Sequence, residues 1–267
     1  MRSDAGTIVV GYDGSPEADG ALRWAVGTAD LEGHRVRAVV VDQSGEGRHA
    51  LSRAEALLAR SDVPGTSELH AGHVIPVLLR EAREAAMLLL GSRGHGWAAD
   101  ATGRSVSQHL ARRAPCPVVV ARAALHPGAD RIVVGVDGSR QSRAALEFAC
   151  RRATTTRESV VAVHAWRPGR ANVDGRGQLS SRLAGRAHEA ELALDRYVGD
   201  LASLYPDVDL TQESIAVPAA VALADTSAGA SLVVTGCRGR GVMSGVLFGS
   251  VSHHLLHQAR CPVAVVH

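Results

Sequence analysis

The stretch ASLVVTGCRG at residues 230–239 joins a short apolar run to a glycine-rich loop, and GSVS follows at residues 249–252. The apolar run at 232–235 is typical of a buried strand in a parallel sheet. Residues 251–258 are typical of a helix, for which Ser250 is the predicted N-cap. Glycines let backbone N–H groups approach an anion, and a helix N-terminus adds unpaired N–H groups and a positive dipole end. We therefore predict a phosphate-binding loop over this stretch.

Two well-known phosphate loops do not fit. A Walker-type loop requires a lysine, and all 29 basic residues of the chain are arginine. The G-x-G-x-x-G motif that opens directly into a helix is also absent here. Instead, two glycines with two residues between them are followed by nine residues and then a Gly-Ser pair. A loop whose glycines serve only tight turns is the alternative interpretation, because the chain contains 28 glycines.

Composition bounds the class of protein. A length of 267 residues fits two ordinary domains, and aromatic residues make up only 3%, so the core is expected to consist of Val, Leu and Ala. A formal charge of +2 gives no reason to expect binding to nucleic acid or to a membrane surface. The first residues lack the apolar core of a signal peptide, and no apolar run approaches the ~20 residues that span a bilayer. With four cysteines and no CxxC pair, free thiols in the cytoplasm are predicted.

The chain repeats itself. The first matched pair is offset by 124 residues and three further pairs by 145, so the second copy carries 21 extra residues. Such a repeat predicts a duplicated domain. We predict a first domain at 1–122, a linker at 123–130 and a second domain at 131–267. The matched pairs are 7–15 with 131–139, 87–94 with 232–239, 105–107 with 250–252, and 116–120 with 261–265.

Each copy alternates apolar strands with amphipathic segments, which predicts a parallel sheet with helices on both faces. Ligands bind such sheets at the carboxyl ends of the strands, near the switch point. The 21 extra residues are placed around a long second helix at about 179–204. The predicted strands are 8–11, 36–41, 69–73, 87–90 and 118–121 in the first copy, and 132–135, 160–165, 210–215, 232–235 and 263–266 in the second.

The duplication, the Asp-Gly-Ser turn after each first strand, the glycine spacing and the final Cys-Pro-Val strands together resemble the ATP-binding branch of the universal stress protein family. The resemblance covers nearly the whole chain. It implies two tandem Rossmann-like domains of the adenine nucleotide α-hydrolase-like type. Each would be a five-stranded parallel sheet of order 3-2-1-4-5, flanked by helices, with one nucleotide per domain. Because the last strand commonly pairs domains or subunits in this family, we expect an intramolecular pseudo-dimer and allow for a homodimer of chains.

The resemblance places an ATP site in the second copy, with or without Mg²⁺. It implies that the Asp137 carboxylate accepts from ribose hydroxyls or adenine, whereas a purely turn-forming role is the alternative. The hydroxyls of Ser250 and Ser252 are expected to donate to phosphates. The implied contacts are Val136, Asp137, Gly138, Ala165, Gly236, Arg238, Gly239, Gly249, Ser250, Val251 and Ser252.

The first copy departs from this pattern. Arg104 stands where the third glycine of the spacing is expected, and Gly103 lies one place early. We therefore predict weaker or absent nucleotide binding there. Any contacts are expected from Tyr12, Asp13, Gly14, Val41, Gly91, Gly94 and Ser105.

The resemblance implies a cytoplasmic stress-response protein in which nucleotide occupancy regulates conformation or the binding of an unidentified protein partner. Without a Walker lysine, paired carboxylates for Mg²⁺ or a placed general base, at most slow ATP hydrolysis is expected. One alternative is an interaction module without nucleotide. Another is a hydrolase of the related fold that cleaves ATP between its α- and β-phosphates, although residues 137–140 do not match that class's Ser-Gly-Gly-x-Asp-Ser loop.

Two other groups of residues were weighed as sites. His253 and His257 lie one helical turn apart, and His70 and His73 are similarly close, but neither pair has ligand partners at a known spacing, so no metal site is predicted. Cys237 lies inside the glycine loop beside Arg238. A redox-sensitive thiol there is the functional interpretation, and a small residue that fits the loop is the favoured one.

Overall fold

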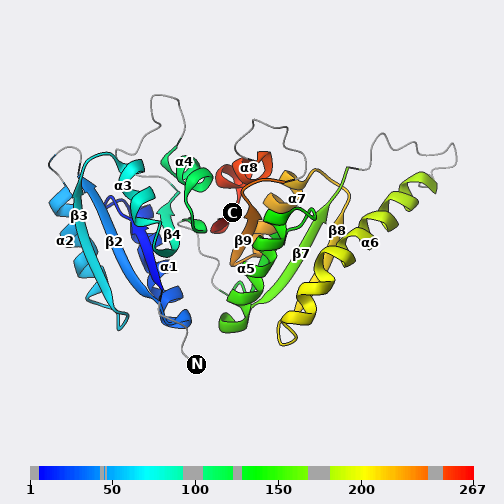
Figure 1. Ribbon diagram of the computed structural model, residues 1–267, viewed down its shortest axis with the longest axis horizontal. Coiled ribbons are helices and arrows are strands. Elements are labelled where there is room, and N and C mark those ends of the chain that lie inside the picture. The colour runs from blue at the N-terminus through cyan, green and yellow to red at the C-terminus, as the bar shows by residue number, and fades with distance from the viewer. Residues whose placement is uncertain are drawn as a thin grey trace. The chain divides into compact units, whose positions relative to one another are not determined.

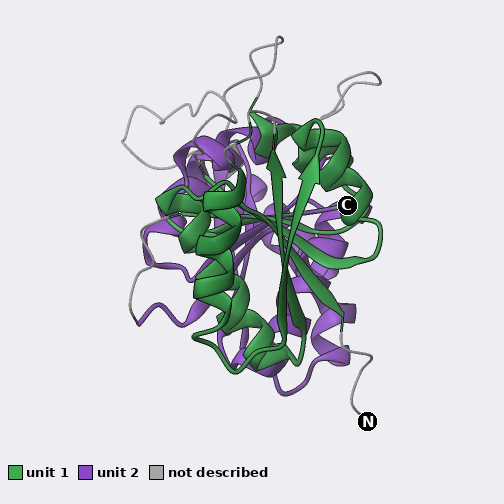
Figure 2. Cartoon of the chain, turned by 90° about the vertical axis from the view of Figure 1, so that its left-hand side faces the viewer, with its two compact units in different colours: residues 1–125, 261–265, 267 green, residues 126–260, 266 purple. Residues whose placement is uncertain are grey.

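The structure is a computed structural model that describes residues 6–42, 45, 47–92, 105–122, 128–167, 181–239 and 249–267. The chain divides into two compact units (Figure 2). Unit 1 comprises residues 1–125, 261–265 and 267, and unit 2 comprises residues 126–260 and 266.

Unit 1 alternates strands and helices (Figure 1). Its parallel strands follow the order β3-β2-β1-β4-β5, which is the predicted order. Residues 263–265 of the chain's last strand, β10 (Val263–Val266), also belong to this unit and pair antiparallel with β5. The other elements are β1 (Thr7–Gly11), α1 (Pro16–Glu32), β2 (Arg35–Asp42), α2 (Gly47–Leu58), β3 (Gly65–Ala71), α3 (Val74–Glu81), β4 (Ala85–Gly91), α4 (Val106–Arg113) and β5 (Val118–Ala121).

Unit 2 repeats the plan with parallel strands in the order β8-β7-β6-β9. The extra residues lie between its second and third strands, as predicted, where α6 has 24 residues against 12 in α2. The elements are β6 (Arg131–Gly135), α5 (Arg140–Thr156), β7 (Ser159–Ala165), α6 (Ser181–Leu204), β8 (Leu210–Ile215), α7 (Ala219–Thr226), the 3₁₀ turn η1 (Ser227–Gly229), β9 (Leu232–Gly236) and α8 (Ser250–Gln258).

Helices cover the sheet of unit 2 in two groups. α5 and α6 contact each other and lie against β7, whereas α7 contacts α8 and lies against β6 and β7. Strands covered on both faces must be apolar along their length, which explains their continuous Val and Leu runs. Their central side chains are fully buried, among them Val133, Val134, Val233 and Val234.

The Asp-Gly-Ser turn after the first strand has the same form in both units. The serine N–H donates to Oδ1 of the aspartate two residues before it, at 3.0 Å for Asp13 and 2.9 Å for Asp137. The glycine between them, Gly14 or Gly138, has φ of +79° or +75°, which disfavours any residue with a Cβ. The same serine then caps the following helix, its Oγ accepting a backbone N–H at 3.1 Å in each unit.

Candidate functional site

Unit 2 contains a cavity of about 260 Å³ at the carboxyl ends of β6, β7 and β9, beside α7 and the first turn of α8. Doubly wound sheets bind ligands at this edge. The lining residues are Gly135, Val136, Asp137, Ser142, Val163, Ala165, Ala219, Leu223, Thr235, Gly236, Arg238, Gly239, Gly249, Ser250, Val251 and Ser252.

The structure brings the residues predicted for the second copy together around this cavity. All of them line it except Gly138, which forms the centre of the Asp-Gly-Ser turn. The lining that the sequence did not single out comes mostly from strand ends and from α7, namely from Ala219 and Leu223. No sequence motif marks α7. The only signal for it was that the alternation of strands and helices predicts a helix after the third strand of each copy.

The cavity lining is apolar on one set of elements and polar on another. The ends of β6 and β7 together with α7 supply mostly aliphatic residues, whereas the segment after β9 and the start of α8 supply glycines, serines and Arg238 together with one aliphatic residue, Val251. Such a division suits a ligand with a flat apolar part and an anionic part. The aliphatic lining residues are Val136, Val163, Ala165, Ala219, Leu223 and Val251.

The N-terminus of α8 faces this cavity without a side-chain cap. Gly249, with φ of −70°, is the N-cap, and among the described residues no side chain accepts a hydrogen bond from the first turn. The prediction that Ser250 caps this helix is therefore wrong: the helix begins one residue earlier, with Ser250 as its first residue. Because glycine has no side chain to accept these bonds, the first-turn N–H groups are left for water or for an anion.

Hydrogen bonds join the end of β9 to the start of α8. The N–H of Gly249 donates to the carbonyl of Cys237 at 2.9 Å, and the buried hydroxyl of Ser252 donates to the carbonyl of Gly236 at 2.8 Å. The Ser252 proton is therefore used inside the protein in this structure, and its donation to a phosphate stays a prediction. Ser252 contributes to the site by fixing the loop.

The structure establishes one of the two roles that the sequence left open for Asp137. Its Oδ1 accepts the turn hydrogen bond, which establishes the turn-forming role. Its Oδ2 lies so close to Gly239 that a Cβ added there would collide with it. Asp137 therefore lines the cavity next to the glycine loop, and its contact with a ligand remains a prediction.

Cys237 does not have the surroundings of a reactive thiol. Its side chain is buried, and burial raises the pKa of the thiol even though the neighbouring Arg238 lowers it. Reactive cysteines are accessible and have a low pKa. The structure favours the interpretation that Cys237 is a small residue that fits the loop.

In the first copy, Asp13 and Gly14 form the same turn as in the second. Val41 is buried at the end of β2, and a Cβ at Gly91 would lie 2.8 Å from the carbonyl carbon of Glu17. Ser105 caps α4, its Oγ accepting the N–H of the residue three positions on at 3.3 Å. Gly94, Gly103 and Arg104 lie outside the described residues.

Tyr12 belongs to a buried polar network of unit 1. Its hydroxyl donates to Oδ1 of Asp19 at 2.5 Å, and Arg53 of α2 donates to both carboxylate oxygens of Asp19. Burial alone would raise the pKa of Asp19, but the hydrogen bonds from Arg53 and Tyr12 outweigh it and hold that pKa below its usual value. Burial and the Asp19 charge raise the pKa of Tyr12. The second copy has Val136 and Arg143 at the positions of Tyr12 and Asp19.

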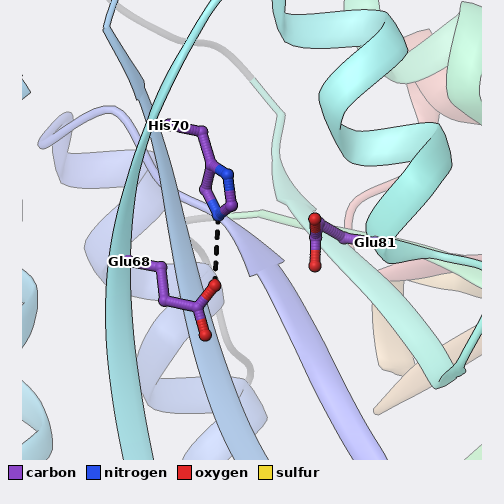
Figure 3. Close-up of side chains that lie close together, drawn as sticks. All are labelled: Glu68, His70 and Glu81. Carbon is purple, nitrogen blue, oxygen red and sulfur yellow. Dashed lines mark hydrogen bonds and ion pairs between the residues drawn. The ribbon is translucent and has the colours of Figure 1, made fainter.

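Glu68, His70 and Glu81 of unit 1 are close enough together to hold a metal ion, and Figure 3 shows His70 facing Glu68 with Glu81 beyond it. Two guanidinium groups already neutralise them: Arg37 lies 3.5 Å from Glu68 and 3.3 Å from Glu81, and Arg80 donates to Glu81 at 2.9 Å. Arg80 also donates to Nδ1 of His70 at 3.1 Å, so Nε2 carries the proton shared with Glu68 at 3.1 Å. The group therefore forms a closed ion-pair network. The sequence analysis missed both glutamates.

Comparison with known proteins defines the class of protein. Residues 42–122 and 128–267 match the Universal stress protein family. A universal stress protein of Mycobacterium tuberculosis H37Rv, Rv2005c, is 35% identical over 286 residues, which cover 97% of this chain and 96% of that protein. A second one, Rv2623, is 32% identical over 287 residues, covering 97% and 95%. The crystal structure of a universal stress protein from Archaeoglobus fulgidus DSM 4304 superimposes with a TM-score of 0.71 at 16% identity, covering 99% of both chains, and supports the fold.

The chain therefore belongs to the universal stress protein family. Two copies of the family's domain follow each other in the sequence, so it is a tandem universal stress protein. Among the described residues, no helix is both long and apolar enough to cross a membrane.

Proposed function

We propose that unit 2 binds ATP and that occupancy of this site regulates the conformation of the chain or its binding of a partner protein. The observation that carries the proposal is the first turn of α8, which faces the cavity with no side-chain cap. A phosphate is a suitable partner for these N–H groups, because it accepts several hydrogen bonds and interacts favourably with the positive end of the helix dipole.

The remaining lining supports the same ligand. Arg238 provides a permanent positive charge beside the glycine loop, which partly replaces the lysine that this chain lacks. The aliphatic residues of β6, β7 and α7 suit the flat face of adenine. Asp137 offers a carboxylate that accepts from ribose hydroxyls or from adenine.

The lining also favours binding over turnover. Among the described residues around the cavity, Asp137 is the one carboxylate, so the paired acidic groups that hold Mg²⁺ in phosphoryl-transfer enzymes are not present there. Any Mg²⁺ would arrive with the phosphates. We propose that hydrolysis is at most slow and that the bound state itself is the signal, in keeping with a role in the stress response.

One experiment separates this proposal from its alternatives. The full chain is purified without added nucleotide and denatured, and the released small molecules are identified by mass spectrometry. A nucleotide-free sample of the chain is then titrated with ATP by calorimetry. The proposal expects about one ATP per chain and a raised Tm on adding ATP. Formation of AMP and pyrophosphate would instead indicate the hydrolase. No bound nucleotide and no thermal shift would indicate an interaction module.

We also propose that the first copy binds ATP weakly or not at all, so that calorimetry fits one site per chain. Two equal sites would overturn this. The proposed domains are residues 1–122 and 131–267, joined by 123–130, in a cytoplasmic protein whose four cysteines are buried and free. We also propose that the two copies form an intramolecular pseudo-dimer. Light scattering tests whether whole chains dimerise.

A further inference from the structure

The peptide group between Val136 and Asp137 is held at both of its ends. Its carbonyl oxygen lies 2.8 Å from Nδ1 of His164 on β7, and its N–H donates to Oγ of Ser142 on α5 at 3.3 Å. Because this peptide group carries the carboxylate of Asp137 into the cavity, its position decides where that carboxylate lies. The two hydrogen bonds form a clamp, the His164–Ser142 clamp.

The hydrogen-bond roles in the clamp follow from the chemistry of its groups. A carbonyl oxygen only accepts, so Nδ1 of His164 carries a proton and donates it. The Ser142 hydroxyl donates its one proton to the carbonyl of Ser139 at 3.0 Å, which leaves its oxygen to accept from Asp137. Ser142 is buried. Each member of the clamp is therefore oriented by a defined partner.

The clamp reaches the long helix of unit 2. The ring of Tyr197 on α6 meets the ring of His164 edge to face, with centroids 5.6 Å apart and planes at 78°. This geometry is favourable for aromatic pairs and limits rotation of the imidazole. Tyr197 thus orients the His164 ring, which in turn hydrogen-bonds the carbonyl of Val136. A chain of contacts connects α6 with the floor of the cavity.

The first copy has neither arm of the clamp. Strand register places Val40 at the position of His164, since Val39 pairs with Gly11 as Val163 pairs with Gly135. The residue equivalent to Ser142 is Ala18. Neither side chain donates or accepts a hydrogen bond. The clamp is therefore a feature of the unit that contains the cavity, and the Asp-Gly-Ser turn forms without it in the other.

We propose that His164 and Ser142 are positioning residues that fix Asp137 for nucleotide binding, and that Tyr197 connects α6 to the occupancy of the site. The inference rests on the proposed function, because it assigns how that same site is organised. His164 and Ser142 act through Asp137 and not by touching the ligand's reacting atoms. Through the contact between His164 and Tyr197, α6 is the element whose position changes when Asp137 binds the nucleotide.

The test uses two amide variants of His164 in the full chain. His164→Asn places an N–H donor close to the position of Nδ1, whereas His164→Gln places it close to that of Nε2 and away from the carbonyl. ATP affinity is measured by calorimetry, and Tm by circular dichroism. We expect His164→Gln to weaken ATP binding about fivefold to tenfold, the effect of losing one hydrogen bond, and His164→Asn to restore most of it. His188→Leu, an exposed change on α6, is the control.

A double-mutant cycle separates positioning from a merely structural role. If His164 acts through Asp137, the effect of His164→Gln on ATP affinity falls below about twofold in an Asp137→Asn background, because coupled residues are not additive. The inference would be overturned if the effects of the His164 and Asp137 changes on ATP affinity were additive, or if His164→Asn and His164→Gln bound ATP equally well. The proposed function would still stand in that case, provided that the wild-type chain binds ATP. A wild-type chain that binds no ATP would overturn both.

Discussion

The two units share one backbone turn and differ in what surrounds it. Asp13 and Asp137 accept the same hydrogen bond at nearly the same distance, and each is followed by a glycine of positive φ. His164 and Ser142 hold the peptide before Asp137, whereas Val40 and Ala18 occupy those positions in the first copy. The comparison teaches that the Asp-Gly-Ser turn forms in either setting, and that only in the second copy do neighbouring elements hydrogen-bond the peptide group before the aspartate.

The helices that follow the fourth strand of each copy differ in the same sense. The start of α4 is satisfied by the chain itself, because the Ser105 hydroxyl accepts one of its first N–H groups. The start of α8 has glycine as its N-cap and no such bond. A helix start left without a side-chain acceptor is available to an external anion. This contrast is the reason why the phosphate end of the proposed site is placed at the start of α8. The following predictions test the contrast between the two copies, from the largest expected effect to the smallest.

The largest effect is expected from Gly249→Leu. A Cβ at this position would already lie 3.3 Å from the Cys237 carbonyl and from Ser252 Oγ, so a leucine side chain must take up space in the cavity. We expect ATP affinity to fall by at least about 100-fold in calorimetry. Gly199→Leu, at a helical glycine with open space around it, is the matched control. Unchanged affinity in Gly249→Leu would place the ligand elsewhere.

A paired substitution compares the two turns directly. Asp137→Asn and Asp13→Asn each keep an oxygen for the turn hydrogen bond and remove the charge. We expect the Asp137 change to weaken ATP binding about tenfold, the usual effect of losing a charged hydrogen bond, and the Asp13 change to alter it by less than about twofold. Equal losses in the two variants, measured by calorimetry, would mean that both copies bind nucleotide.

Acid should reveal the polar network that only the first copy has. Since the pKa of Asp19 is lower in the folded chain than its usual value of 3.8, its contribution to stability is complete above that pH and is lost as the pH falls through the folded pKa. We therefore expect Asp19→Asn to lower the Tm by about 5 °C at neutral pH and by progressively less below pH 3.8. The Tm of both chains is measured by calorimetry across this pH range. A Tm difference that does not change with pH would exclude the Asp19–Arg53 ion pair as its source.

The smallest effect is expected from the cysteines. Burial raises the pKa of Cys116 and of Cys150 to about 11 and raises that of Cys237 as well. Thiols that are buried and protonated react slowly. We expect no fast reaction of the native chain with a thiol reagent at pH 8, full reaction after unfolding, and ATP affinity within about twofold of wild type for Cys237→Ser. Fast labelling of Cys237 in the native chain would restore the redox interpretation.

Sequence reasoning found residues that line the cavity where a strand end or a glycine loop marks them. Repeated motifs identified both copies, and the segments around Asp137 and Gly236 meet in one cavity. It failed where the information is carried by contacts between distant residues. Nothing near Ala219 or Leu223 in the sequence indicates that they line the same cavity, since they come from a helix, α7, that only packing brings to it.

By itself, the sequence determined the duplication, the alternation of strands and helices, and the Asp-Gly-Ser turns, because these depend on local backbone preferences and on hydrophobic periodicity. The tertiary structure alone decided that Gly249 and not Ser250 is the N-cap of α8, that the Ser252 proton goes to Gly236, and that His164 reaches the carbonyl of Val136. Those outcomes depend on which hydrogen-bond partners lie within reach after the sheet has formed, and spacing along the chain does not contain that information.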